Sequence, residues 1–102
     1  MQDVQPTDQC ADPAPKVQRD QALTAMFKPN ELVWIVDESY NPVDTTWRVD
    51  LVRQGLQGVW MRQRYRYDTP SGVIYFVGEK PINETELAAA RRMGRQIGRT
   101  KS

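Results

Sequence analysis

Residues 56–80 constrain the fold most tightly, because their pattern is that of one long β-hairpin. The first arm alternates two kinds of side chain, with Trp60, Arg62, Arg64 and Arg66 at even positions and Val59, Met61, Gln63, Tyr65 and Tyr67 at odd positions. Successive residues of a strand point to opposite faces of its sheet. The pattern therefore predicts a strand with one cationic face and one mostly apolar face.

The second half of this stretch completes the hairpin. Residues 68–72 supply Pro70, which presets its own φ, and Gly72, which tolerates the positive φ of a tight turn. An uninterrupted apolar run over residues 73–77 predicts the returning strand. We expect Phe76 in this run to lie in the core, so that its replacement by Ala would damage folding.

Upstream of the hairpin, the sequence predicts a short helix and two strands. Residues 19–28 carry apolar side chains at helical spacing, and Pro29 ends the helix. Residues 31–38 are apolar on both faces, which is typical of a strand covered on both sides. Residues 47–52 alternate between apolar and polar side chains and predict the next strand.

The residues after Pro81 predict an amphipathic helix that reaches Ile97. Asn83 and Glu86 have the spacing of a capping box, in which each side chain bonds to the backbone N–H of the other residue. At about 100° per residue, one side of this helix collects Leu87, Ala90, Met93, Gly94 and Ile97. The opposite side collects Arg91, Arg92, Arg95 and Arg99.

These elements predict an α+β fold: a four-stranded, mostly antiparallel sheet (a meander), with a short N-terminal helix and a C-terminal amphipathic helix. We expect one domain over residues 19–98, a disordered, acidic, Pro-containing arm over residues 1–18, and a frayed basic tail over residues 99–102. A single terminal helix covers only one face of the sheet. The N-terminal helix or a second copy of the chain must cover the other, so a homodimer is a further hypothesis.

The side-chain inventory argues against an enzyme. The chain has no histidine, which removes the commonest general base and metal ligand, and its only cysteine is Cys10, so no intramolecular disulfide can form. We therefore predict no catalytic residue, no metal site and no cofactor. The sequence also lacks an apolar run of the roughly 20 residues that a membrane span needs. The expected setting is cytoplasmic, away from membranes.

Charge is distributed unevenly along the chain. Residues 1–45 hold three basic and eight acidic side chains, whereas residues 46–102 hold eleven basic and five acidic ones. Arginines interleaved with aromatic rings suit single-stranded nucleic acid, because the guanidiniums meet phosphates while the rings stack on bases. Binding of single-stranded nucleic acid is therefore the first functional hypothesis, through Trp60, Arg62, Arg64, Arg66, Arg91, Arg92 and Arg95.

Two alternatives to this hypothesis remain open. Arg62, Arg64 and Arg66 can instead form an ordinary solvated strand face, paired with Asp50 and Glu79 across the sheet. The chain can also be a protein-binding adaptor or an accessory subunit of a larger assembly, since exposed aromatic residues and arginines are enriched at interface anchors.

The order of four strands followed by a helix, over residues 31–97, resembles that of the single-stranded-DNA-binding coactivator family called positive cofactor four. The resemblance is one of element order alone, and it assigns no role to any residue.

Overall fold

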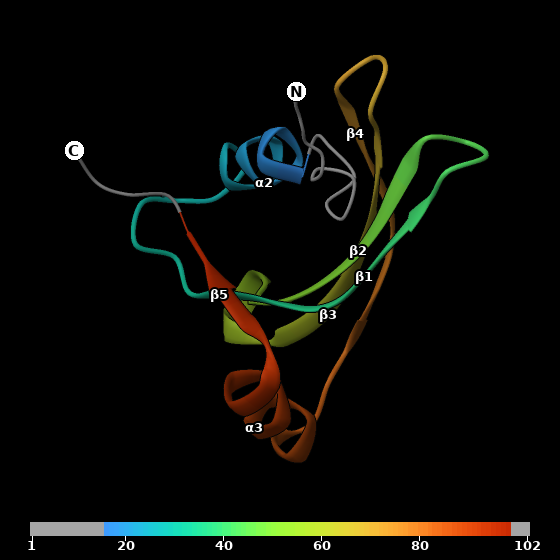
Figure 1. Cartoon of the computed structure of the whole chain (residues 1–102). Helices are drawn as coiled ribbons and strands as arrows, with labels where there is room; N and C mark the ends of the chain where they lie inside the picture. Colours follow the sequence, from blue (N-terminus) through green and yellow to red (C-terminus); the bar gives the residue numbers. More distant parts are fainter. Residues whose placement is uncertain (1–15, 99–102) are drawn as a thin grey trace, which may run out of the picture.

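The structure, a computed structural model, describes residues 16–98 (Figure 1). The expectations for residues 1–15 and 99–102 lie outside the described residues. Two α-helices and five strands follow one another in the order α2 (Lys16–Thr24), β1 (Val33–Asn41), β2 (Thr46–Gln54), β3 (Trp60–Asp68), β4 (Val73–Pro81), α3 (Glu84–Met93) and β5 (Arg95–Ile97), with a 3₁₀ turn, η2 (Leu56–Gly58), before β3. The α+β class is as predicted.

The strands form one antiparallel sheet in the order β4-β3-β2-β1-β5. The meander of β1 to β4 and its long hairpin are confirmed, and Gly72 in the hairpin turn has a φ of 74°. The predicted count of four strands was one too few. The additional strand is β5, which pairs with β1 over three residues.

The predicted C-terminal helix was too long. It ends at Met93, and residues 95–97 are β5 instead. The reason lies at Gly94, which adopts an extended conformation (φ −79°, ψ 165°) and passes close to β1: a Cβ added there would lie 2.6 Å from the Ala90 carbonyl oxygen and 3.0 Å from that of Ile35. At the other end of α3 the predicted Asn83–Glu86 capping box is present.

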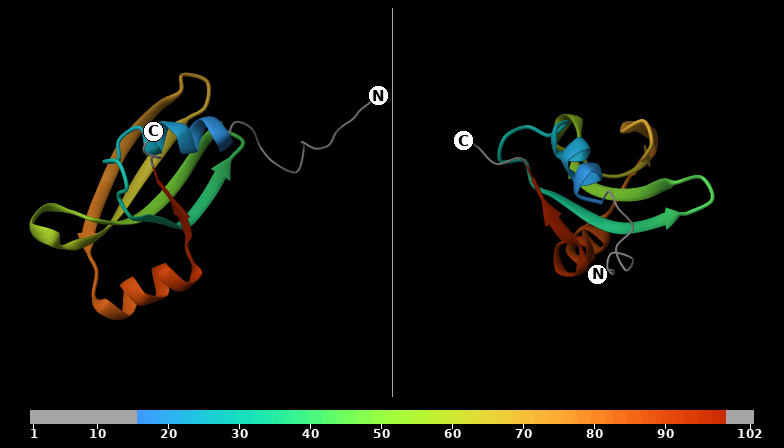
Figure 2. Two further views of the ribbon diagram at one scale, coloured as in Figure 1. Left: turned by 90° about the vertical axis from the view of Figure 1, so that its left-hand side faces the viewer. Right: turned by 45° about the horizontal axis from the view of Figure 1, so that its top comes forward.

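The first described helix also differs from its predicted bounds. It begins at Lys16, so residues 16–18 belong to the helix and not to the arm, and it ends at Thr24. The helix lies in the concavity of the curved sheet, while α3 lies on the opposite, convex side (Figures 1 and 2). Each helix therefore covers a different face of the sheet.

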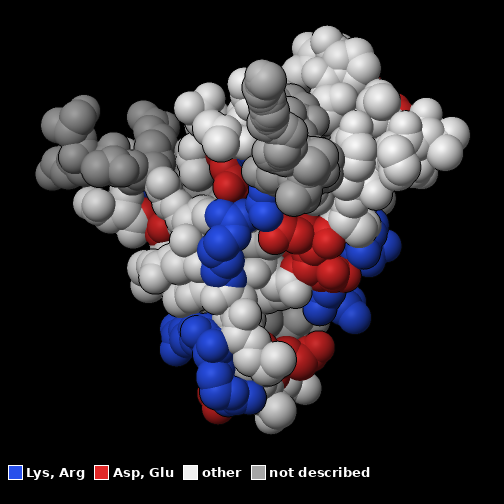
Figure 3. Space-filling model, viewed as in Figure 1, with Lys and Arg blue, Asp and Glu red and all other residues white. Residues whose placement is uncertain are grey.

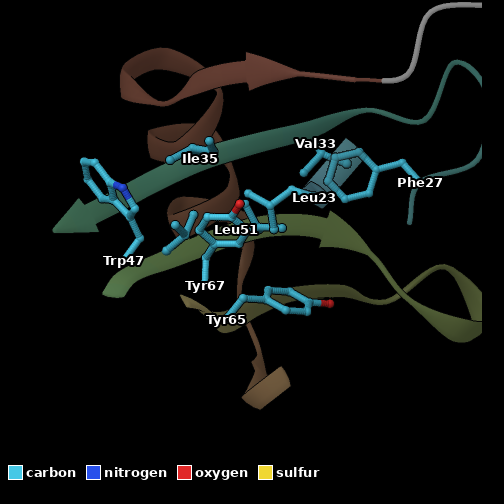
Figure 4. Close-up of a cluster of buried hydrophobic side chains, with 9 residues drawn as sticks. Leu23, Phe27, Val33, Ile35, Trp47, Leu51, Tyr65 and Tyr67 are labelled. Carbon is cyan, nitrogen blue, oxygen red and sulfur yellow. The ribbon is translucent and has the colours of Figure 1, made fainter. Parts of the chain in front are cut away.

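The hydrophobic core fills the concave side, between α2, the segment that follows it, and the first three strands (Figure 4). Leu23 is fully buried, as are Val33, Val49 and Leu51. The cluster consists of Leu23, Phe27, Val33, Ile35, Trp47, Val49, Leu51, Tyr65 and Tyr67.

Phe76 is not part of this core, and the expectation that it would be buried was wrong. Its side chain contacts Tyr65, with ring centroids 5.5 Å apart, but is 57% exposed. The physical reason is its position in β4, an end strand with a neighbouring strand on one side only among residues 16–98.

Candidate functional site

The convex face of the sheet gathers the arginines that the strand alternation places on one side. Strand pairing sets Arg62 opposite Val52, Arg64 opposite Asp50 and Arg66 opposite Arg48. Since Tyr65 and Tyr67 of the same strand lie in the core, these arginines occupy the other face. Three of the seven predicted site residues are thus neighbours on one surface.

A single buried carboxylate holds this arginine cluster together. Asp50 is 1% exposed. Arg62 donates from Nε and Nη2 to Asp50 Oδ2 at 3.1 and 2.9 Å. Arg64 donates from Nε to Oδ1 at 2.9 Å and from Nη2 to Oδ2 at 3.2 Å. Arg48 lies 3.5 Å from Oδ1 and also donates to Asp37 at 3.1 Å.

The ionisation of Asp50 reflects these contacts. Burial by itself would raise the pKa of this carboxyl group, but hydrogen bonds from Arg64 and Arg62 outweigh it and hold the pKa below its usual value. The same hydrogen bond raises the pKa of the Arg64 guanidinium. Asp50 is therefore an anion at neutral pH, with several cations arranged around it.

Asp50 was one of two carboxylates expected to pair with these arginines, and that pairing is present. The other expectation was wrong, because Glu79 accepts a hydrogen bond from Gln63 at 2.8 Å. Gln63 belongs to the concave face, as does Tyr65, whose hydroxyl donates to it. The difference arises because β4 gains an extra residue at Val77, which shifts its register against β3.

Two adjoining hollows lie over the arginine cluster. The first has a volume of about 560 Å³ and is lined by Asp50, Arg62, Arg64, Val77, Gly78, Glu79 and Lys80. The second, of about 360 Å³, is lined by Ser39, Asn41, Thr46, Arg48, Arg64, Arg66 and Val77. Arg64 and Val77 border both hollows. A Cβ added at Gly78 would meet no atom within 4 Å, so no side chain fills the first hollow above this glycine.

An exposed aromatic ring borders the same surface. Tyr75 of β4 pairs with Arg66 of β3, and the Arg66 guanidinium lies 5.4 Å from the centre of the Tyr75 ring. Tyr75 is 45% exposed. Arg66 makes no ion pair with any residue in the described range 16–98. Tyr75 and Lys80 were not predicted as site residues. A strict period of two would place them on opposite faces, and the extra residue at Val77 brings both to this one.

The other four predicted site residues do not border the two hollows, although Trp60 lies on the same face of β3 as Arg62. The Arg91 guanidinium lies over two neighbouring rings, 5.6 Å from the centre of Trp34 and 5.3 Å from that of Trp60. Trp60 thereby anchors α3 to the sheet and is not a free stacking surface. Arg92 sits beside Arg91 in the last turn of α3. A basic patch covers this helix at the bottom of the view in Figure 3.

Arg95 belongs to the concave side, because it pairs with Ile35 of the core. It donates to Asp20 of α2 at 3.0 Å and lies 3.6 Å from Glu38 of β1. Burial lowers the pKa of Arg95, but the hydrogen bond to Asp20 and further acidic contacts raise it overall. Arg95 therefore ties β5 to α2.

Sequence reasoning also missed a buried cation. Arg19 of α2 is fully buried, 2.7 Å from both Asp20 and Glu38, with its guanidinium 4.5 Å from the Trp47 ring centre. Helical spacing alone gave no sign of it, because its acidic partner Glu38 is distant in sequence. The contacts of Arg19 hold α2 on the sheet.

A larger cavity lies apart from the arginine cluster. Its volume is about 830 Å³, and it opens beside η2 on the concave side, where it is lined by residues that include Lys28, Arg53, Met61 and Gln63. In its wall Arg53 donates to both carboxylate oxygens of Glu31 at 2.9 Å, so the charges of these two side chains compensate each other. This cavity presents less free charge than the convex face.

No protein-family model matches this chain, and neither a curated protein nor a solved structure shows significant similarity to it. Function must therefore be argued from the geometry. Within residues 16–98, no three Asp, Glu or Cys residues are grouped closely enough to hold a metal ion. Neither described helix has the length and apolar character to cross a membrane.

Proposed function

We propose that the chain is a non-enzymatic binding module whose convex face binds the phosphate backbone of single-stranded nucleic acid. The observation that carries this proposal is the arginine cluster around Asp50, overlain by two adjoining hollows. Phosphates would lie in the hollows and accept hydrogen bonds from the guanidiniums around them.

The balance of charge supports an anionic ligand. Five cationic side chains border the two hollows: Arg48, Arg62, Arg64, Arg66 and Lys80. The carboxylates bonded to this set are Asp37 and Asp50, and Glu79 also lines the first hollow, which leaves an excess of two positive charges. Pairing with Asp50 weakens the cationic character predicted for this face, but one carboxylate shared by three arginines cannot neutralise it.

The pairing also prepares the arginines for binding. A guanidinium carries five N–H groups, and Arg62 and Arg64 each direct only Nε and Nη2 toward Asp50. Their side chains remain 36% and 49% exposed. An arginine that is already held loses less conformational entropy on binding than a free one. Asp50 therefore acts as a positioning residue for the remaining donors.

Tyr75 is the ring best placed to stack on a base. It is exposed and lies beside Arg66, within the row of cations. Since Trp60 is occupied by Arg91, base stacking contributes less here than it does in a surface with several free rings. Affinity should come mainly from phosphate contacts and should fall steeply with salt.

The test is fluorescence anisotropy with a labelled oligothymidylate of about 15 nucleotides, titrated between about 50 and 200 mM salt. The test variant is Arg66→Ser with Lys80→Ser, because neither side chain has an ion pair with a residue in 16–98 and the fold should survive. Each lost phosphate contact should reduce the steepness of the log–log salt dependence by about 0.7.

The matched control is Lys28→Ser with Arg92→Ser, which also removes two positive charges, both from exposed side chains outside the two convex hollows. Its affinity and salt dependence should stay close to those of the parent chain. Equal weakening by the control and the test variant would assign binding to overall charge, and no detectable binding at low salt would overturn the proposal.

A protein-binding role is the second candidate, favoured by the apolar side chains that β4 exposes. Val73, Tyr75, Phe76 and Val77 are between 43% and 58% exposed. The affinity for a protein bound through such residues should change little over the salt range in which binding to phosphates weakens steeply. The salt series therefore separates the two candidates.

A further inference from the structure

The free edge of β4 is long and uncharged over most of its length. β4 pairs with β3 on one side and with no strand on the other among residues 16–98. Seven of its nine residues are exposed. The first five, Val73–Val77, carry no charge, and the only charged residues of the strand are Glu79 and Lys80, just before Pro81.

The opposite edge of the sheet is built differently. β5 has only three residues and begins with Arg95 and Gln96, both exposed. Natural sheets protect their edges with short strands, charges and prolines, because an unprotected strand recruits further strands. β5 has this protection, whereas the apolar half of β4 has neither a charge nor a proline, and its one irregularity is the bulge at Val77.

Both faces of β4 expose apolar groups. Tyr75 lies on the convex side with Arg66, and Val77 borders both convex hollows. Phe76 lies on the concave side with Tyr65 and is 57% exposed. A run of β-branched and aromatic residues without charge or proline is an aggregation hazard when it stays uncovered. A partner for this edge must therefore supply a strand and apolar side chains on both faces.

We propose that β4 pairs antiparallel with β4 of a second copy of this chain, so that two five-stranded sheets become one. A two-fold arrangement completes both free edges at once and places apolar side chains of one copy against those of the other. The assembly stops at two chains because β5, the other edge, is too short and polar to propagate it.

Charge favours a second copy over other occupants. The exposed stretch Val73–Val77 offers a nucleic acid or an acidic peptide no cation along the edge itself. In an antiparallel pair, Glu79 and Lys80 of each copy lie toward the uncharged start of the other strand, so like charges do not meet. The chain itself supplies the complementary uncharged strand.

The pairing would also enlarge the proposed ligand face, a point that rests on the proposed function. Val77, Gly78 and Lys80 of β4 border the first convex hollow. A two-fold axis perpendicular to the joined sheet keeps both convex faces on the same side. The arginine clusters of the two copies would then flank one seam, and a longer oligonucleotide could contact both.

The test is sedimentation equilibrium of the full chain from low to high micromolar concentration. We expect a dimer in which the strands pair about Val77, the middle residue of β4. Val77→Lys should make it monomeric, because two ammonium groups would meet near the axis. Phe76→Glu is the second variant, and circular dichroism checks that both keep the fold. Met93→Lys is the matched control, since Met93 is 78% exposed on α3 and should leave the dimer intact.

A parent chain that stays monomeric throughout would overturn the inference, as would a dimer that neither β4 variant weakens. Oligonucleotide binding is measured on the same samples. A dimer without oligonucleotide binding would sink the proposed function and leave the pairing of β4 intact. A monomer that binds oligonucleotide would do the reverse.

Discussion

Asp50 is the single residue that decides what the convex face can do. The sequence allowed its neighbouring arginines to be either free cations or partners of acidic residues, and the pairing with Asp50 is right for Arg62 and Arg64. The face nevertheless keeps a cationic excess, because three arginines surround one buried carboxylate. The net charge of the face thus depends on how many carboxylates pair with the arginines, and not only on whether such pairs exist.

Replacing Asp50 with Asn should lower the free energy of unfolding by about 1 to 3 kcal/mol at pH 7, because charge-assisted hydrogen bonds to two arginines are weakened. Urea denaturation measures the loss. Asp37→Asn is the control, since Asp37 is exposed and its only ion pair within residues 16–98 is with Arg48, and its effect should stay within about 1 kcal/mol. Equal losses for the two variants would contradict the role given to Asp50.

The pH dependence has a defined sign. The folded chain lowers the pKa of Asp50 below the unfolded value of about 3.9. The stabilisation is therefore fully present above about pH 4 to 5 and is lost as the pH falls through the lower, folded pKa. The stability gap between the parent and Asp50→Asn should be constant near neutral pH and should shrink in acid. A gap that persists unchanged to low pH would refute this linkage.

At the scale of elements, the turn from α3 into β5 shows how a local rule gives way to packing. Arginines and apolar residues at helical spacing predicted a helix to Ile97, but the chain leaves the helix at Gly94 to pair with β1. The backbones are too close there to accept a side chain. The added strand pairings outweigh the last helical turn.

Gly94→Ala should therefore lower the free energy of unfolding by about 1 to 3 kcal/mol, as overpacking does. Hydrogen exchange should show lost protection at β5 and at the β1 amides paired with it. Gly78→Ala is the matched control, because an added Cβ there meets no atom within 4 Å. If both alanines behaved alike, close approach at Gly94 would not explain where the helix ends.

At the scale of the whole molecule, α2 covers the core on the concave side of the sheet. Leu23 and Phe27 enter the core from α2 and the turn after it, while the buried Arg19 and the exposed Arg95 bind the acidic side chains of Asp20 and Glu38. The sheet and this helix should therefore unfold together. Loss of packing at one residue of α2 should therefore destabilise the entire domain.

Leu23→Ala should lower the free energy of unfolding by about 2 to 5 kcal/mol, because it opens a cavity at a fully buried position. Leu56→Ala is the control, since Leu56 is 91% exposed and its change should stay within about 0.5 kcal/mol. Thermal and urea denaturation should report one transition in each variant. A separate early transition of α2 alone would show that this helix is not part of the cooperative unit.

Much of the fold was predictable from the sequence, and less of the candidate site. The two-residue period of 59–67 placed Arg62, Arg64 and Arg66 on one face, as the register confirms. The same reasoning could not exclude Trp60 and Arg91, which contact each other, because their meeting depends on how α3 crosses the sheet. Arg95 lies on the concave side and not on the predicted helix face, because residues 95–97 form a strand that pairs with β1.

The sequence by itself determined the local structure of this protein: the alternating strands, the turn at Gly72 and the capping box that begins α3. Such features depend on residues only a few positions apart, and their backbone preferences act before any tertiary contact forms. Tertiary structure alone decided that Arg62 and Arg64 share the Asp50 carboxylate, that residues 95–97 form a fifth strand and that Phe76 stays exposed. These outcomes depend on strand register and sheet curvature, which bulges such as the one at Val77 shift by a residue at a time.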